Sequence, residues 1–353
     1  MDQLEFLQWD SDRRYGVELE INAFDGKSRP GPDDKSPKGI AEVGDIIVRR
    51  TGHGVKITKW GHTHNNDFYV VKPDGSCGME VCTPILKGWD GLSQVIGLAD
   101  IFRTEGKIKS DERCSLHVHV NVNGCDLTEV ASAAAWWVKC EPVFIDSMPA
   151  RRKKSRYCQV VGMSDMFDHA QRPDPRDILD RLASAKYFTF NDYHYNQKDS
   201  GKQRDTIEYR LAENSACLDP YYIKNWVRLV VHFTDRAMKR GMPGTYKSSD
   251  PLSGLSWLDP IAVFEFLGFM PGQYQLSPGL AQVRDWFLAR IYINIFDGNL
   301  PGLWSKIGRS HAFKEVVEII LKIEKADGRS FDFTEAMYPL EDQDALYLEK
   351  YQM

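Results

Sequence analysis

Acidic and imidazole side chains occur at every second position in several apolar stretches of the sequence. Glu18 and Glu20 alternate with valine, leucine and isoleucine in the stretch GVELEI, and His117 and His119 alternate with leucine and valine in SLHVHV. Because successive side chains of a β-strand point to opposite faces, this spacing predicts strands with one apolar face and one reactive face. Like charges on one face need a counter-charge, which a divalent cation can supply.

Two further stretches follow the same alternation. Glu80 lies in GMEVCTP, and Glu208 and Arg210 lie in TIEYR. If these strands are neighbours, their polar faces merge into one acidic floor that also contains histidine. Oxygen-rich donor sets of this kind favour Mg²⁺ or Mn²⁺ over zinc, and no third histidine lies at a spacing suited to zinc.

Each motif by itself also has an ordinary explanation. The glutamate pair fits the solvated edge of a half-buried strand, and the histidine pair fits ordinary hydrogen bonding. Glu208 with Arg210 fits a simple salt bridge. Four such strands in one chain favour a shared function over four independent coincidences.

Arginines are the second requirement if the chain handles phosphate, because the planar guanidinium binds phosphate through two parallel hydrogen bonds. The candidates are Arg156, Arg204 and Arg210, and the predicted strand fixes Arg210 best. Arg156 ends the densest basic run, residues 151–156, and such a run is usually a solvated face.

Other catalytic devices are absent from the sequence. It contains no G-x-S-x-G elbow, no P-loop and no G-x-G-x-x-G, and no cysteine lies in a catalytic signature. Nucleophilic catalysis by the protein therefore has little support, and neither of the two common glycine-rich loops is available to bind phosphate.

The elements that carry these residues predict an α+β fold. Besides the four motif strands, short strand-like pieces are expected at residues 45–48, 55–58, 67–71 and 187–191, after a polar loop at 25–38. Helices are expected at residues 89–102, 127–143, 173–185, 220–238, 261–267, 281–291 and 313–325. The pieces between residues 40 and 71 resemble antiparallel hairpins. We therefore expect a mainly antiparallel sheet flanked by helices, with a mostly helical C-terminal region.

Composition places the chain among ordinary globular proteins. Of its 353 residues, 42% are hydrophobic and 27% are charged, and the net charge is -5. A chain with this charge has no global attraction to nucleic acid or anionic membrane. Its N-terminus is too charged for a signal peptide and no apolar run is long enough to cross a bilayer, so the cytoplasm is the expected location. The odd number of cysteines predicts reduced thiols.

The motifs and their order resemble the amidoligase family, which belongs to the superfamily of glutamine synthetase and glutamate-cysteine ligase. The resemblance is carried by GVELEI, by DGS followed by GMEVCTP, by SLHVHV and by TIEYR, and it covers about residues 14–238. TIEYR and the following CLDPY are also similar to the E-x-R and N-P-Y passage of glutamine synthetases, with Asp219 in place of their asparagine. The resemblance implies a glutamine-synthetase-like catalytic domain at residues 1–240 and a helical extension at 241–353.

The resemblance also implies two or three Mg²⁺ or Mn²⁺ ions. The metal ligands that it implies are Glu18, Glu20, Glu80, His117 and Glu208. Glu20 and Glu80 would hold one ion, whose remaining acidic ligand the sequence leaves unassigned. The other three would hold an ion that bridges the phosphates of ATP.

The resemblance assigns the catalytic and cofactor-binding roles mainly to arginines. Arg210 would contact the γ-phosphate or an acyl-phosphate. Arg156 and Arg204 would bind phosphate or the substrate carboxylate, Glu208 counts as catalytic as well as metal-binding, and His119 would support the bound cofactor from behind the metal ligands.

The implied activity is ATP-dependent amide formation between a carboxylate and an amine through an acyl-phosphate. Two alternatives stay open, a metal-dependent phosphoesterase that uses the same acidic site and a non-catalytic binding protein on a ligase fold. The family often occurs in bacterial and phage genomes, so the acceptor could be a cell-wall peptide, an amino-acid conjugate or a modified nucleobase in DNA. No membrane partner is expected, and the oligomeric state is open.

Overall fold

The computed structural model describes most of the chain and divides it into two compact units. The described residues are 11–22, 38–58, 67–75, 77–105, 108–153, 155, 158–161, 174–183, 187–192, 205–243, 257–272, 275–296 and 306–337. We call Asp12–Val120 with Ala212–Val227 the strand-rich unit, and Asn121–Leu211 with Arg228–Leu340 the helix-rich unit.

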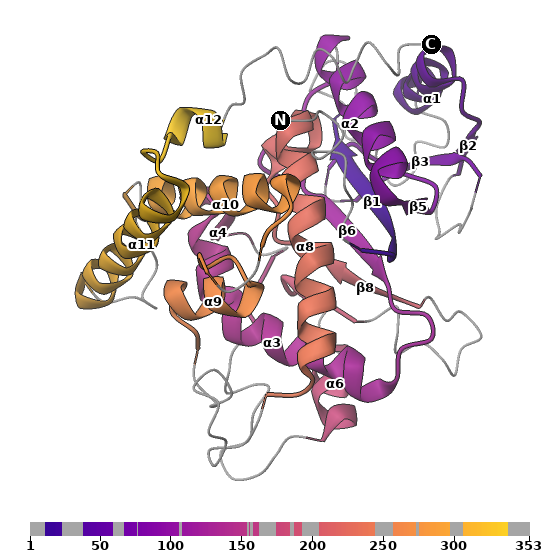
Figure 1. Ribbon diagram of the computed structural model, residues 1–353. Helices are drawn as coiled ribbons and strands as arrows, with labels where there is room; N and C mark the ends of the chain where they lie inside the picture. Colours follow the sequence, from indigo (N-terminus) through magenta and orange to yellow (C-terminus); the bar gives the residue numbers. More distant parts are fainter. Residues whose placement is uncertain are drawn as a thin grey trace. The chain divides into compact units, whose positions relative to one another are not determined.

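A twisted set of strands forms the centre of the strand-rich unit (Figure 1). Its strands are β1 (Arg14–Ile21), β2 (Val55–Ile57), β3 (Tyr69–Pro73), β4 (Met79–Cys82), β5 (Leu86–Lys87) and β6 (Leu116–Asn121). They lie in the order β2-β3-β4-β1-β6, and β5 pairs with the start of β1. Strand β1 is antiparallel to both β4 and β6, which puts the glutamate motif between the two other motifs.

The register of these pairs brings the polar residues onto one face. Glu18 pairs with His117, and Glu20 pairs with Glu80. The opposite face carries fully buried apolar side chains such as Leu19, and it packs under helices α1 (Lys38–Thr51) and α2 (Gly88–Thr104). The short helix η3 (Asn214–Leu218) contacts β1 and α2. Alternation along the strands thus separates the core from the candidate chemistry.

Two predictions about this unit are wrong. Residues 45–48, expected to form a strand, lie inside α1, because Ile40, Val43 and Ile47 recur at helical spacing and are buried. The expected hairpins are also absent between β2 and β3, which run parallel. The sheet is therefore mixed and not mainly antiparallel, although the α+β class is confirmed.

The helix-rich unit is built around helix α3. Its described elements are α3 (Leu127–Asp146), α4 (Ala150–Lys153), α6 (Pro175–Ala183), β7 (Phe190–Asn191), β8 (Thr206–Tyr209), α8 (Pro220–Arg240, from Arg228), α9 (Pro260–Leu267), α10 (Pro278–Phe296), α11 (Lys306–Asp327) and α12 (Phe333–Met337). A capping box of Asp126 and Glu129 starts α3. Near its middle, the buried ring of Trp137 contacts the rings of Phe144, Tyr209 and Phe233.

Most predicted elements outside the 40–71 segment are confirmed. The helices expected from residues 89, 127, 173, 220, 261, 281 and 313 correspond to α2, α3, α6, α8, α9, α10 and α11. Strands β7 and β8 pair in antiparallel orientation. All seven cysteines are free thiols, as expected. In the described ranges, no helix has the length and apolar content needed to cross a membrane. The domain boundary at residue 240 stays a prediction.

A tight contact between α2 and β5 gives a prediction for stability. A Cβ atom on Gly91 would lie 2.8 Å from Leu86 Cβ and 3.2 Å from Leu86 Cα, whereas one on Gly97 of the same helix would meet no atom within 4 Å. Alanine normally stabilises a helix by up to about 1 kcal/mol relative to glycine. We expect Gly97→Ala to show this gain, but Gly91→Ala to lower the free energy of unfolding by about 1–3 kcal/mol.

Urea unfolding of the two variants beside the wild type measures the difference. A Gly91→Ala protein as stable as Gly97→Ala would show that the close packing of α2 on β5 is not as described.

Candidate functional site

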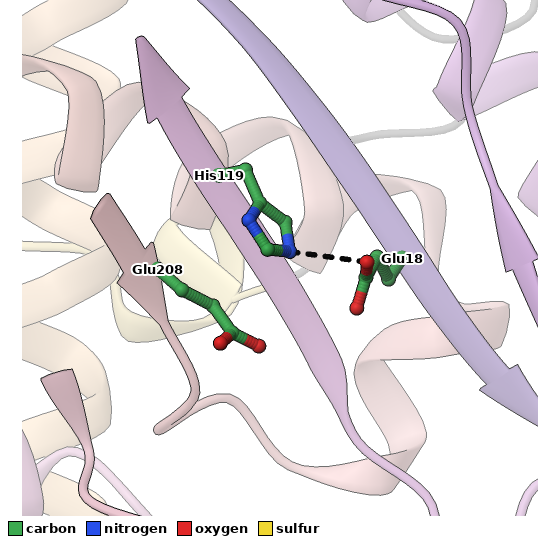
Figure 2. Close-up of side chains that lie close together, drawn as sticks. All are labelled: Glu18, His119 and Glu208. Carbon is green, nitrogen blue, oxygen red and sulfur yellow. Dashed lines mark ion pairs between the residues drawn. The ribbon is translucent and has the colours of Figure 1, made fainter. Parts of the chain in front are cut away.

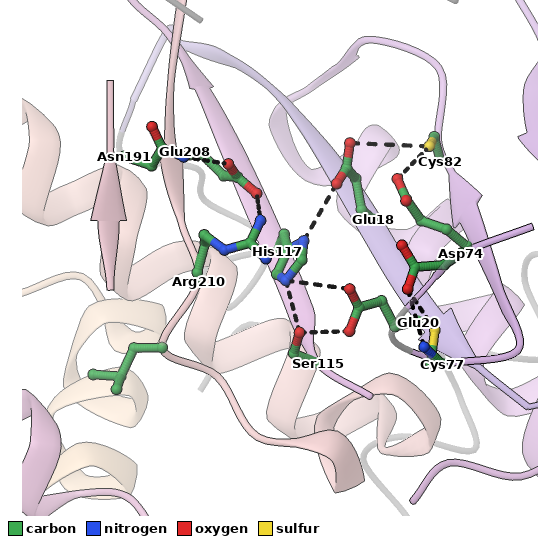
Figure 3. A network of polar contacts seen from close by, with 12 residues as sticks. Glu18, Glu20, Asp74, Cys77, Cys82, Ser115, His117, Asn191, Glu208 and Arg210 are labelled. Atoms are coloured by element: carbon green, nitrogen blue, oxygen red, sulfur yellow. Dashed lines mark hydrogen bonds and ion pairs between the residues drawn. The ribbon is translucent and has the colours of Figure 1, made fainter. Parts of the chain in front are cut away.

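A chain of hydrogen bonds joins β1 to β6 on the polar face of the strand-rich unit (Figure 3). The Ser115 hydroxyl donates to Glu20 Oε2 at 2.7 Å, and His117 Nε2 lies 2.7 Å from the same hydroxyl. Because a hydroxyl has one hydrogen and Glu20 receives it, His117 Nε2 must be the donor to Ser115. The other nitrogen, Nδ1, faces Glu18 and carries a hydrogen while the two side chains form an ion pair. Loss of that hydrogen would give Nδ1 the lone pair with which imidazole binds a metal.

Glu18 lies between two imidazoles. Its Oε2 is 3.3 Å from His117 Nδ1, and its Oε1 is 3.1 Å from His119 Nε2, the ion pair drawn in Figure 2. Burial acts to raise the pKa of Glu18, but His119, His117 and Lys72 outweigh it and hold the pKa well below the usual value. Glu18 is therefore an ionised carboxylate at neutral pH.

Strands β3 and β4 add a lysine and a thiol to the same face. Lys72 Nζ lies 2.9 Å from Glu80 Oε1, and the Cys82 thiol donates to the same oxygen at 3.1 Å. Burial and the charge of Glu18 raise the pKa of Glu80 to about 7, although Lys72 acts in the opposite direction. Burial lowers the pKa of Lys72, but the charges of Glu80 and Glu18 raise it by more, so the ammonium stays protonated.

Two groups of donor atoms in this unit are close enough to share a metal ion. Glu18, Glu80 and Cys82 form one, and Glu20, Asp74 and Cys77 form the other, with ligand atoms within 4.8 Å of one another in each. The donor set is mainly carboxylate, with one thiol in each group. These residues fit a hard divalent cation such as Mg²⁺ or Mn²⁺.

The helix-rich unit has a carboxylate on β8 and a guanidinium directly after that strand. Arg210 Nη1 donates to Glu208 Oε1 at 2.6 Å, and Asn191 Nδ2 lies 3.4 Å from Glu208 Oε2 (Figure 3). Both side chains are buried, with 2% of Glu208 and 8% of Arg210 exposed. Removing one partner of a buried charged pair is costly, because the other charge is then left uncompensated away from water. The two residues therefore hold each other in place.

The structure thus groups the predicted residues within each unit. In the strand-rich unit it brings together Glu18, Glu20, Glu80, His117 and His119. In the helix-rich unit it brings together Glu208 and Arg210. Arg156 and Arg204 lie outside the described residues, and their roles stay predictions.

Two described residues of the basic run at 151–156 turn inward, although its composition predicts a solvated face. Arg152 is 5% exposed, and the side chain of Lys153 is 2% exposed and lies 3.6 Å from Asp146. Composition does not reveal which cations of a run turn inward, and here the short helix α4 buries two of them.

Several residues of these clusters are not among the site residues predicted from the sequence. Cys82 shares a face with Glu80 at a spacing of two, and Lys72 continues the alternation of β3 by one position beyond the predicted strand end. The same spacing rule could have found both. Asp74 and Asn191 carried no such signal, because a turn and a separate strand bring them to their partners.

Comparison with known proteins agrees with the motif pattern. The model of the family described as "Putative amidoligase enzyme" matches residues 11–234. This match contains every predicted site residue in both units. No curated protein matches the chain.

Proposed function

This chain belongs to the amidoligase family, and from that premise we propose that it is an ATP-dependent carboxylate-amine ligase that forms an amide through an acyl-phosphate. The observation that best supports the proposal is the carboxylate and imidazole cluster on the polar face of β1, β4 and β6. A cluster of buried acids is electrostatically costly unless cations accompany it. Ligases that transfer phosphoryl groups use such cations.

We assign the metal ligands to the same cluster. Glu18, Glu20, Glu80 and His117 would hold Mg²⁺ or Mn²⁺ in the strand-rich unit. Glu208 is proposed as a metal ligand of the helix-rich unit. When bound, the ions would neutralise charge on the transferring phosphoryl oxygens. Ser115 orients His117 for this role, because its hydroxyl fixes which ring nitrogen carries the hydrogen.

The reaction needs no nucleophile from the protein. A carboxylate oxygen of the substrate bonds to the γ-phosphorus as the bond to the β-phosphate oxygen breaks, which releases ADP. The amine nitrogen then bonds to the acyl carbon, phosphate leaves with its oxygen, and the amine loses a proton. Arg210 is proposed to bind the phosphoryl group, since a guanidinium stabilises negative charge on phosphate oxygens.

Release of ADP tests the proposal. The purified protein is incubated with ATP and Mg²⁺ across pools of carboxylates, amino acids and polyamines, with Glu208→Ala as the inactive comparison. We expect ADP release only where both a carboxylate and an amine are present. Phosphate release that needs neither would favour a phosphoesterase, and no release from any pool would favour a binding protein.

Metal binding gives a prediction that does not depend on turnover. We expect Mn²⁺ to raise the thermal unfolding temperature of the wild type, because a ligand at about a hundredfold excess over its Kd stabilises the folded state by about 3 kcal/mol. Glu18→Gln should lose most of this increase, whereas Glu42→Gln, on the exposed side of α1, should keep it. An equal increase in both variants would exclude Glu18 as a ligand.

A further inference from the structure

The guanidinium of Arg152 is directed at the backbone that follows β8. Its Nε donates to the carbonyl of Leu211 at 3.1 Å, and its Nη2 donates to the carbonyl of Arg210. Both bonds are buried, and only 5% of Arg152 is exposed. With so little of its surface exposed, this side chain is not available to solvent or to a surface partner.

The backbone that Arg152 contacts is the one that carries Arg210. Strand β8 ends at Tyr209, so the carbonyls of the next two residues lie beyond the strand that pairs with β7. The amide of Arg210 donates to the carbonyl of Thr189 at 2.8 Å. The peptide groups of Arg210 are therefore held through Thr189 on one side and through Arg152 on the other, while Glu208 holds the side chain.

We propose that Arg152 is a positioning residue for Arg210, which it fixes by holding two successive carbonyls at the end of β8. This inference rests on the proposed function only in that Arg210 is taken to bind the phosphoryl group. Arg152 itself touches neither substrate nor reacting atoms in this proposal.

The chemistry of arginine suits this role better than that of lysine. A planar guanidinium has several donors in a fixed arrangement and can reach two neighbouring carbonyls at once, and it remains charged at all accessible pH values. A lysine ammonium at the same place keeps the charge but lacks the planar fork. The role therefore depends on geometry and not only on charge.

Further contacts on both sides of α4 anchor this helix, so the position of Arg152 is well defined. Lys153 of the same helix lies 3.6 Å from Asp146, at the end of α3. The carbonyl of Ser147 in the turn between the two helices accepts hydrogen bonds from Arg290 Nε at 3.1 Å and from Asn294 Nδ2 at 3.0 Å. Helix α10 of the C-terminal region thus supports the turn from which α4 and Arg152 extend.

Three variants test the proposal: Arg152→Lys, Arg152→Gln and the neighbouring exposed Arg151→Gln as a control. Hydrogen exchange of residues 205–213 reports how firmly the Arg210 amide is held. Steady-state ADP release with the active substrate pair reports kcat and KM for ATP. We expect both Arg152 variants to show faster exchange in this segment and a loss of kcat on the order of 10- to 100-fold. Arg151→Gln should match the wild type in both measurements.

Two results would overturn the proposal. The first is wild-type turnover in Arg152→Lys, which would mean that charge alone is needed at this position. The second is unchanged exchange of residues 205–213 in both Arg152 variants. If the wild type releases no ADP with any substrate pool, the proposed function fails, and the exchange measurement still decides whether Arg152 holds Arg210.

Discussion

Replacing Glu208 with glutamine will lower the rate of ADP release by on the order of 10²- to 10³-fold, the cost of removing one charged group that acts on the transition state. Glutamine keeps the shape of the side chain and an oxygen that can still accept the hydrogen bond from Arg210 Nη1. The protein should therefore stay folded, and the loss should appear in kcat. Glu208→Ala should lose at least as much activity.

The comparison between the two variants separates chemistry from folding. Alanine leaves the buried guanidinium of Arg210 without its carboxylate, which costs about 3–5 kcal/mol of stability for a buried pair. Asp205→Asn, a half-buried acid just before β8, is the matched control and should retain both stability and turnover. If Glu208→Gln turned over like the wild type with an intact fold, neither Glu208 nor the proposed site around it could be required for the reaction.

Replacing Glu141 with glutamine will flatten the dependence of stability on pH. Glu141 lies inside α3 and is fully buried. Its Oε1 accepts hydrogen bonds from the Val161 amide at 3.0 Å and from the Thr189 hydroxyl. Its Oε2 is buried and has no partner among the described residues. Burial raises the pKa of Glu141 to about 8, and its hydrogen bonds offset this only in part.

The direction of the pH effect follows from the raised pKa. Between pH 4.5 and about 8 the folded protein keeps a proton on Glu141 that the unfolded chain releases. This contribution to stability is complete below the unfolded pKa and is lost as pH rises through the folded pKa. Since one pKa unit corresponds to 1.36 kcal/mol, the loss across this window is at most about 4–5 kcal/mol.

Urea unfolding of the wild type and Glu141→Gln at several values between pH 5 and pH 8 measures this effect. The glutamine cannot ionise, and its oxygen can still accept hydrogen bonds from Val161 and Thr189. As pH rises, the free energy of unfolding of the wild type should therefore fall relative to that of the variant. Glu318→Gln on the exposed face of α11 should follow the wild type. If the free energy of unfolding changed with pH in the same way in all three proteins, Glu141 would not be protonated in the folded state as described.

The polar faces of the strands were readable from the sequence because alternation is a local property. Glu18 and Glu20 had to share a face once residues 14–21 formed a strand, and the same holds for His117 and His119. The pairing of Glu20 with Glu80 was not readable, because it joins residues that are far apart in the chain. The spacing therefore predicts which side chains share a face, whereas only the strand register shows which of these faces lie next to each other.

The predictions that were wrong or incomplete also have physical causes. The run Ile46-Ile47-Val48 has the β-branched composition of a strand, but the wider window has helical spacing and buries Val43 and Ile47 against the sheet. The parallel pairing of β2 with β3 cannot be recognised from the sequence of either strand. Lys72 and Arg152 were missed because long cations are expected at the surface, and only tertiary contacts reveal that these two are buried.

The ammonium of Lys72 supplies a counter-charge that is fixed in the sheet. It lies 2.9 Å from Glu80 and carries a positive charge that is covalently part of the sheet. This tethered counter-ion cannot diffuse away, so it partly offsets the repulsion between Glu80 and Glu18 even when no other cation is present. Lys72 therefore helps to keep β3, β4 and β1 paired through a charge that belongs to the chain itself.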